Sequence, residues 1–451
     1  MKTVDKGRVS AMMARERQRF TETHPRSRAL HQQASHSLLS GVPMNWMTRW
    51  PGDFPVFVVE TKGATLLDAD GIEYIDLCLG DTGAMAGHTP AATVSAVAAQ
   101  AARGFTTMLP TEDAAIVSEE LARRFGLPLW QFTLSATDAN RFALRLARQI
   151  TGRSKVLVYD HCYHGTVDET FATLDASGTV VPSYGNIVPS VNPAETTRVG
   201  QWNDLAALEN ALAQGDVACV LAEPVMTNVG IVLPDDGYHT ALRELTRTYQ
   251  SLLIIDETHT LCAGPGGYTA AHGLEPDLLT IGKAIGGGVP CGAYGMSQEV
   301  ADRVLERTLW EVADVGGIGG TLAANRLSTA AMRATLSEVL TAEAFARMIA
   351  LGERYERGVG GVIARAELPW HVVRVGCRVE YLFTPEHPRN GTEAGAAMDR
   401  ELDALLHLYL LNRGVLMTPF HMMALMSPAT AAADVDRHTA VFAEAVAELA
   451  G

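Results

Sequence analysis

The sequence predicts an α/β fold in which a mostly parallel sheet lies between helical layers, with a smaller α+β domain at the C-terminal end. Three observations lead to this prediction. Short apolar runs without polar alternation recur along the chain, as strands buried on both faces do. Helical patterns such as ATVSAVAAQAARG separate these runs, which is typical of a parallel sheet. The 451 residues are 47% hydrophobic, enough for one large core and a smaller one.

The elements follow in order along the chain. Residues 1–74 are expected to form a helix, an irregular arm, a strand at Phe54–Glu60 and a turn at Asp68–Gly71. The large domain, 75–330, should contain four buried strands, which are KVLVYD near 155, ACVLAEP near 218, LLIIDE near 252 and LLTIGK near 278. The small domain, 331–451, should contain the strand segment HVVRVGCRVEYLF, a helix over Asp399–Arg413 and a final helix after Asp434.

Charge and targeting signals argue against nucleic acid and membrane as partners. The 51 acidic residues against 36 lysines and arginines give a net charge of -15, which would repel phosphate backbones and anionic membranes. The charged N-terminus lacks the apolar stretch of a signal peptide, and no window approaches the roughly 18 apolar residues of a membrane span, so we expect a cytoplasmic location. The six cysteines form no CxxC pair, so no metal site or disulfide framework is expected.

A carboxylate and a lysine each follow a predicted strand. Asp256 comes after the run Leu252–Ile255, and Lys283 comes after Leu278–Gly282, 27 positions later. Both should lie at the carboxyl edge of the sheet, where open α/β sheets bind ligands. Taken singly, Asp256 is better explained as a turn cap and Lys283 as a solvated surface residue. Together they indicate one chemistry, because a lysine amine forms an imine with an aldehyde cofactor and a carboxylate keeps a pyridine ring protonated.

Other residues at this edge could complete a cofactor site. The tripeptide Ser135–Thr137 precedes a predicted helix whose free N–H groups would favour an anion, although a simple helix cap explains the tripeptide alone. Tyr163 follows KVLVYD, and its ring could stack on a pyridine. Taken alone, Tyr163 is more simply interpreted as an ordinary core or surface tyrosine. Glu223 ends the run ACVLA, and Asn228 close behind could donate a hydrogen bond to a phenolic oxygen.

Taken together, these residues stand in an order that resembles the class III aminotransferases, enzymes of PLP fold type I that use pyridoxal 5'-phosphate (PLP). The resemblance covers most of the chain, and within the family the motifs are most similar to those of the glutamate-1-semialdehyde aminomutases. The best matching stretches are Glu223–Gly230, the block LRELTRTYQSLLIIDETHT, Gly282–Gly295 and Gly320–Asn325. The resemblance implies that residues 75–330 form the PLP-binding domain.

The resemblance also implies a role for each candidate. Lys283 would carry PLP as a Schiff base and Asp256 would pair with the pyridine nitrogen. Tyr163 would stack on the ring, and Asn228 would contact the phenolic oxygen. The phosphate would be bound at the start of the predicted helix, by Ser135, Ala136 and Thr137.

Two further residues take their roles from the same resemblance. Thr321, in the Gly-Thr motif, would reach the phosphate of a neighbouring subunit, which implies an obligate homodimer with shared active sites. Glu223 would line the substrate pocket, where it would order the site rather than perform chemistry. No metal is implied.

Two motifs depart from the family pattern around the cofactor. Ser135–Asp138 reads Ser-Ala-Thr-Asp where the family usually has Ser-Gly-Thr-Glu. Alanine in place of glycine leaves less room for the phosphate, but the backbone N–H groups that would bind it are still present. Asp256–His259 reads Asp-Glu-Thr-His where the family has Asp-Glu-Val. A hydroxyl at Thr258 would therefore meet the ring face where an aliphatic side chain normally packs. The sequence assigns no role to His259.

A third departure concerns the substrate. Trp46 falls at the position of the aminomutases' carboxylate-binding arginine, and an indole cannot replace a bidentate guanidinium. Trp46 would line an apolar substrate wall, with plain packing an equal alternative. Arg49 or Arg413 could supply the positive charge from another direction.

The substitution at Trp46 favours an aminotransferase over an aminomutase. We predict ping-pong transamination, in which an amine or amino acid, including β- and ω-amino acids, donates its amino group to a keto acid, ketone or aldehyde, with Lys283 moving the proton. An aminomutase or racemase is the alternative, because the same lysine and electron sink serve both. A serine hydrolase would need a G-x-S-x-G elbow, which the chain lacks. A binding protein that merely retains the fold would have little reason to keep Lys283, Asp256 and Thr321.

Overall fold

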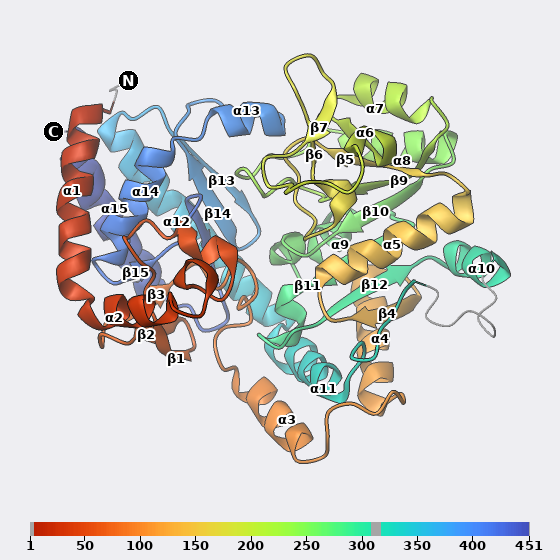
Figure 1. Cartoon of the computed structure of the whole chain (residues 1–451), viewed down its shortest axis with the longest axis horizontal. Coiled ribbons are helices and arrows are strands. Elements are labelled where there is room, and N and C mark those ends of the chain that lie inside the picture. The colour runs from red at the N-terminus through yellow and green to blue at the C-terminus, as the bar shows by residue number, and fades with distance from the viewer. Residues whose placement is uncertain (1–3, 308–316, 451) are drawn as a thin grey trace. The chain divides into compact units, whose positions relative to one another are not determined.

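The computed structural model describes residues 4–307 and 317–450, and contacts divide the chain into two compact units (Figure 1). Unit 1 is made of three segments and unit 2 of two. Unit 1 comprises Met1–Pro90, Ala346–His387 and Ala397–Gly451, and unit 2 comprises Ala91–Phe345 and Pro388–Ala396. The domain boundaries expected from the sequence, after 74 and after 330, stay a prediction.

Unit 2 is built on a 7-stranded sheet with the strand order β4-β12-β11-β10-β9-β5-β8. Successive neighbours from β11 to β8 run parallel, and β12 runs antiparallel to both of its neighbours. The apolar runs of the sequence are β5, β9, β10 and β11, so the mostly parallel sheet is confirmed. The strands are β4 (Leu129–Thr133), β5 (Lys155–Tyr159), β8 (Thr197–Gly200), β9 (Val217–Ala222), β10 (Leu252–Asp256), β11 (Leu278–Gly282) and β12 (Gly292–Met296).

Helices cover this sheet, and α5 lies across it in Figure 1. The apolar face of α5 packs Phe142, Leu146 and Ile150 into one core with Val158 and Ile254 of the strands. The helices of unit 2 are α3 (Ala91–Ala101), α4 (Glu112–Phe125), α5 (Ala136–Thr151), α6 (Pro193–Thr196), α7 (Leu205–Leu212), α8 (Tyr238–Thr248), α9 (Gly267–His272), α10 (Gln298–Arg307), α11 (Arg326–Ala334) and α13 (Gly391–Ala396). Short elements are η3 (Asp168–Thr170), β6 (Ala172–Leu174), β7 (Val180–Pro182), η4 (Thr260–Ala263), η5 (Lys283–Gly286) and η6 (Thr335–Val339).

Unit 1 combines helices with two small sheets, of order β1-β2-β3-β15 and β13-β14-β16. The segment HVVRVGCRVEYLF forms the antiparallel pair β13 and β14, as an α+β region requires. The strand expected at Phe54–Glu60 begins only at Val58. The elements are α1 (Lys6–Thr23), α2 (Pro25–Ala34), η1 (Leu39–Gly41), η2 (Asn45–Arg49), β1 (Val58–Lys62), β2 (Thr65–Asp68), β3 (Glu73–Asp76), β13 (His371–Val375), β14 (Arg378–Leu382), α14 (Arg400–Leu411), β15 (Val415–Leu416), β16 (Met423–Leu425) and α15 (Ala432–Ala450), and α12 (Ala342–Ala366) contains the boundary with unit 2.

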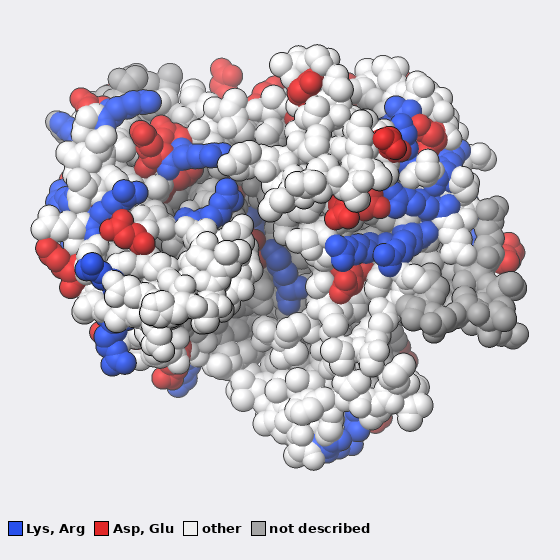
Figure 2. All heavy atoms as spheres, in the orientation of Figure 1, with Lys and Arg blue, Asp and Glu red and all other residues white. Residues whose placement is uncertain are grey.

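Acidic and basic side chains are interspersed on the face shown in Figure 2. Within residues 4–307 and 317–450, no helix combines the length and the apolar character needed to cross a bilayer. In the same ranges, no group of three or more His, Cys, Asp or Glu side chains is arranged to hold a metal ion. A cytoplasmic location stays a prediction.

Candidate active site

Asp256 and Lys283 lie at the ends of adjacent parallel strands. Asp256 is the last residue of β10 and pairs in register with Thr280 of β11, three residues before Lys283. Lys283 begins η5, where its φ of 50° is left-handed. Such backbone is uncommon outside glycine and is concentrated at functional sites. The strand order therefore brings the two predicted residues to one edge of the sheet.

The carboxylate of Asp256 is buried in a hydrogen-bond network. Its Oδ2 accepts from Asn140 Nδ2 at 2.8 Å and from His164 Nδ1 at 3.0 Å, and its Oδ1 accepts from the Thr258 N–H at 3.0 Å. Burial opposes the charge, but His164 and the other donors lower the pKa of Asp256 to about 2. Burial also opposes a charge on His164, whereas Cys162 and Asp256 raise its pKa to about 10. The site thus keeps an ionised carboxylate, the form that can hold a proton on a pyridine nitrogen.

Asn140 joins three elements around this carboxylate. It donates to the His164 carbonyl at 3.0 Å and accepts from the Thr280 hydroxyl at 2.6 Å. The Thr258 side chain lies beside the same carboxylate and also lowers the pKa of Asp256. These residues fit the pyridine ring of PLP.

The predicted phosphate site lies at the start of α5. Ser135 caps the helix, where its Oγ accepts from the Asp138 N–H at 3.2 Å. Ala136 and Thr137 are the first two residues of the helix, and N–H groups at this position have no partner within a helix. They and the helix dipole favour an anion. A Cβ on Gly282 would lie 2.9 Å from Ala136 Cβ, so this glycine lets the end of β11 approach the phosphate site.

Gly165 sets the loop after β5 against the same helix start. The Thr166 N–H donates to Thr137 Oγ1 at 3.1 Å. A Cβ on Gly165 would lie 2.2 Å from Thr137 Oγ1 and 3.0 Å from Thr137 Cα, and its φ is +78°. Any larger residue must therefore push Thr137 out of place or move the loop.

We expect Gly165→Ala to weaken PLP binding at least about tenfold and to lower the free energy of unfolding by about 2 kcal/mol, because the new methyl group displaces Thr137 and strains the backbone. Gly178→Ala is the matched control, since its φ of +81° is similar but nothing lies within 4 Å of its Cβ. Titration of the cofactor-free protein with PLP and denaturant unfolding measure both effects. Equal PLP affinity in the two variants would contradict the steric argument.

Tyr163 and Asn228 lie in the loops after β5 and β9. Tyr163 is 39% exposed, and the centroid of its ring lies 6.4 Å from that of Phe171. Asn228 Nδ2 donates to the His161 carbonyl at 3.0 Å, which ties the two loops together. The stacking of Tyr163 and the contact of Asn228 with a cofactor oxygen stay predictions.

His259 links Lys283 to Glu223. Lys283 Nζ lies 2.5 Å from His259 Nε2, and His259 Nδ1 lies 2.7 Å from Thr227 Oγ1. The Thr227 hydroxyl donates to Glu223 Oε2, which is 3.5 Å from His259 Nδ1. The sequence assigned no role to His259 and did not single out Thr227. Three strand ends of one sheet supply this chain of contacts.

Thr321 lies in an exposed segment beside the start of α5. Gly319, Gly320, Thr321, Leu322 and Ala323 line a small pocket together with Leu134, Asp138 and Phe142. The segment that contains Thr321 thus lies close to the N-terminal end of α5, where the phosphate site is predicted. The contact of Thr321 with a neighbouring subunit stays a prediction.

The predicted substrate-pocket residues outside unit 2 belong to unit 1. Trp46 and Arg49 share the short helix η2 and both contact Phe420. The Trp46 ring stands edge-on at 5.7 Å and the Arg49 guanidinium lies 5.7 Å from the ring centroid. Arg413 instead forms an ion pair with Glu16 at 3.0 Å. The structure therefore pairs Arg413 with a carboxylate of its own chain and leaves Arg49 exposed.

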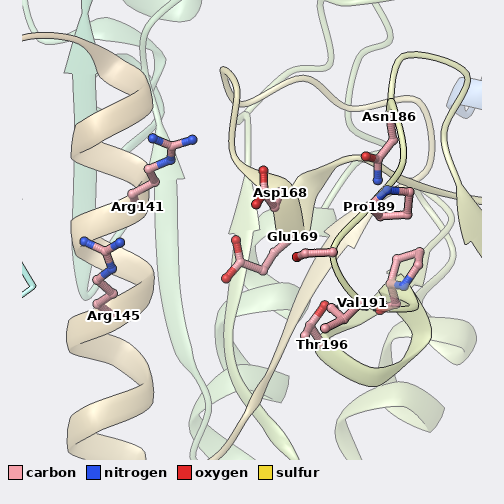
Figure 3. A pocket seen from close by; sticks show the side chains of 10 residues that line it. Arg141, Arg145, Asp168, Glu169, Asn186, Pro189, Val191 and Thr196 are labelled. Atoms are coloured by element: carbon pink, nitrogen blue, oxygen red, sulfur yellow. Dashed lines mark hydrogen bonds between the residues drawn. The ribbon is translucent and has the colours of Figure 1, made fainter.

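A separate pocket lies beside α5, where Arg141 and Arg145 of the helix line it together with Asp168 and Glu169 of a separate segment (Figure 3). Arg141 also donates to the Thr166 carbonyl at 2.5 Å. The walls of this pocket carry both positively and negatively charged side chains. None of the residues predicted to hold the cofactor lines it. The remaining lining residues are Asn186, Pro189, Ser190, Val191, Pro193 and Thr196.

The chain is similar in sequence and in structure to known proteins. Residues 46–445 match the family model for aminotransferase class-III. The chain is 36% identical over 415 residues to a glutamate-1-semialdehyde 2,1-aminomutase of Thermomicrobium roseum, covering 88% of this chain and 92% of that protein. It is 52% identical, with a TM-score of 0.97 and 99% coverage of both chains, to the crystal structure of a glutamate-1-semialdehyde-aminomutase from Pseudomonas aeruginosa PAO1. A lysine-to-alanine variant of that aminomutase, in complex with PMP, is 51% identical with the same TM-score and coverage.

These comparisons correct the function predicted from the sequence. The prediction of a ping-pong transaminase for amines or ω-amino acids is wrong, because the relatives named above, which are 36% to 52% identical to this chain, are named aminomutases. That prediction gave too much weight to Trp46, one side chain in the irregular N-terminal arm. The lysine and carboxylate at the sheet edge serve both reactions and could not decide between them. The aminomutase, named as the alternative, is better supported.

Proposed function

The chain belongs to the class-III aminotransferase family and is a PLP-dependent enzyme, and from this we propose that it is an aminomutase acting on glutamate 1-semialdehyde. The observation that carries the proposal is the 52% identity over 99% of both chains to an aminomutase of that name. Such a reaction is a net isomerisation, in which the amino group moves from carbon 2 to carbon 1 and the carbonyl from carbon 1 to carbon 2. No second carbonyl compound is consumed.

Each residue at the sheet edge would have a separate role in the reaction. When bound, PLP supplies an aldehyde that condenses with amines and a pyridine ring that withdraws electrons. Asp256 would hold the proton on the ring nitrogen, since its carboxylate is ionised and oriented by Asn140 and His164. The N–H groups that begin α5 would hold the phosphate. Lys283 would carry PLP and, with its amine free, move protons to and from the substrate carbons.

The substrate carboxylate needs a cation, because Trp46 stands where the aminomutases carry an arginine. Arg49, a candidate predicted from the sequence, lies three residues after Trp46, and both side chains contact the Phe420 ring. Arg413 is the weaker candidate, because its guanidinium is already neutralised by Glu16.

We propose that the enzyme works as a homodimer. Phe105, Met108, Leu109 and Leu322 are exposed apolar side chains. Their two segments lie side by side, since the Arg326 N–H donates to the Phe105 carbonyl at 2.8 Å. Exposed apolar groups gathered in this way are typical of interfaces between subunits. This surface adjoins Thr321, the residue predicted to serve a neighbouring subunit.

Dependence on an added acceptor tests the proposed reaction. The enzyme loaded with PLP or its amine form is given glutamate 1-semialdehyde, with and without a keto acid such as pyruvate. We expect equal sustained rates in both mixtures, within about twofold, because an isomerisation regenerates the starting form of the enzyme. Turnover that stops after about one substrate per site without a keto acid, and resumes when it is added, would contradict the proposal.

A further inference from the structure

A chain of side chains connects Lys283 with a buried carboxylate. His259, Thr227 and Glu223 are all buried, and they come from the segments that follow β10 and β9. The contacts run from Lys283 Nζ to His259 Nε2 at 2.5 Å and from His259 Nδ1 to Thr227 Oγ1 at 2.7 Å. The Thr227 hydroxyl completes the chain at Glu223.

The number of available protons gives each hydrogen bond its direction. Thr227 has one hydroxyl proton, which it donates to the Glu223 carboxylate, so its Oγ1 accepts from the Nδ1–H of His259. A neutral imidazole with its proton on Nδ1 has a lone pair on Nε2. His259 Nε2 therefore accepts the hydrogen bond that Lys283 Nζ donates.

The surrounding charges favour a proton moving along this chain. His259 faces Lys283 on one side and Glu223 on the other, with Glu223 Oε2 at 3.5 Å from Nδ1. Asp256, three residues before His259, directs its carboxylate to Asn140 and His164 instead. A proton passed from Lys283 to His259 brings the positive charge next to Glu223, where the buried setting strengthens the attraction.

We propose that His259 is a positioning residue that accepts a proton from Lys283. Nε2 takes one proton from the Lys283 ammonium, which leaves a neutral amine with its lone pair and an imidazolium held by Thr227 and Glu223. The proton returns in the reverse step, so nothing else is consumed. The step would operate whenever the Lys283 amine is free, both before PLP is bound and during turnover, and only its use during turnover rests on the proposed function.

The pH dependence of PLP attachment tests this role without any substrate. Cofactor-free enzyme is mixed with PLP, and the growth of the visible absorbance band gives the rate constant from pH 6.5 to 10.5. His259→Gln keeps a hydrogen-bonding side chain but cannot take up a proton. We expect it to be at least about tenfold slower than wild type at pH 7, with the ratio approaching one at the highest pH, where hydroxide is plentiful enough to take the proton in place of His259.

Two further variants separate proton acceptance from packing. Glu223→Gln should slow attachment at pH 7 in the same direction, because the imidazolium loses its counter-charge, and it serves as the test if His259→Gln does not fold. His239→Gln is the control, since His239 lies in unit 2 with Nε2 2.8 Å from the Pro224 carbonyl and should leave the profile unchanged.

The outcomes are distinct. A variant that is slower by the same factor at every pH, or as fast as wild type at pH 7, would overturn the proposal. Because the assay contains no substrate, its result does not depend on whether the enzyme proves to be an aminomutase. A failed acceptor test with an intact pH effect would overturn only the proposed reaction.

Discussion

Lys283→Ala is expected to lower turnover of glutamate 1-semialdehyde on the order of ten-thousand-fold, because one amine would both carry PLP and move the substrate protons. The fold should survive. Lys283 has a positive φ of 50°, and alanine at this position bears a similar backbone cost. Steady-state turnover and denaturant unfolding of the same preparation measure the two effects.

Lys155→Ala is the matched control for that variant. Lys155 begins β5 of the same sheet, and its ammonium lies 3.6 Å from the carboxylate of Asp216. The control should keep turnover within about twofold, since a partly exposed ion pair contributes little. Turnover by Lys283→Ala close to that of Lys155→Ala would remove Lys283 from the mechanism.

Asp256→Asn is expected to lower turnover about a hundred- to a thousandfold, because a neutral amide cannot stabilise a proton on the pyridine nitrogen. With a pKa of about 2, Asp256 is ionised throughout the neutral range. The loss should therefore be the same at every pH between about 5 and 8. Turnover against pH, with the absorbance spectrum of bound cofactor, measures it.

Asp160→Asn controls for the loss of a buried carboxylate. Asp160 directly follows β5 and is bonded to Thr392 at 2.7 Å and to the Leu174 N–H at 3.2 Å. This variant should be destabilised while its folded fraction stays active. Asp256→Asn within about threefold of wild type would contradict the proposed role of the carboxylate.

The central strands could be predicted from the sequence because burial on both faces leaves an unbroken apolar run. Strands β4 and β12 were not predicted, and β12 shows why. A Cβ on Gly292 would lie 2.5 Å from the Ser135 carbonyl oxygen, and one on Gly295 would lie 2.6 Å from the Trp130 ring. Glycine is needed at these strand positions because neighbouring groups occupy the space that a side chain would need. Those neighbours come from other parts of the chain, so the sequence of the strand alone does not reveal them.

The candidate site could be predicted in part for a similar reason. Asp256 and Lys283 end neighbouring strands, so their meeting follows from the topology. Asn140 and His164 are 116 and 92 positions away from the Asp256 that they contact, and tertiary packing alone brings them there. His259 was noted in the sequence, but its contact with Lys283 depends on the backbone turn after β10.

The reaction was the part least accessible to sequence reasoning. Transamination and amino-group migration use the same lysine, carboxylate and phosphate site, so the fold leaves both open. The substitution at Trp46 suggested the wrong choice because it was given more weight than Arg49, which contacts the same Phe420 ring. A guanidinium three residues away can bind a carboxylate, which an indole cannot.

The most direct test of the aminomutase proposal is carbon-13 NMR of glutamate 1-semialdehyde labelled at carbon 1, mixed with the enzyme and no other carbonyl compound. The account predicts that the labelled aldehyde signal disappears and that an aminomethyl signal of equal intensity replaces it over many turnovers. A labelled aldehyde that persists, or that changes only after a keto acid is added, would contradict it.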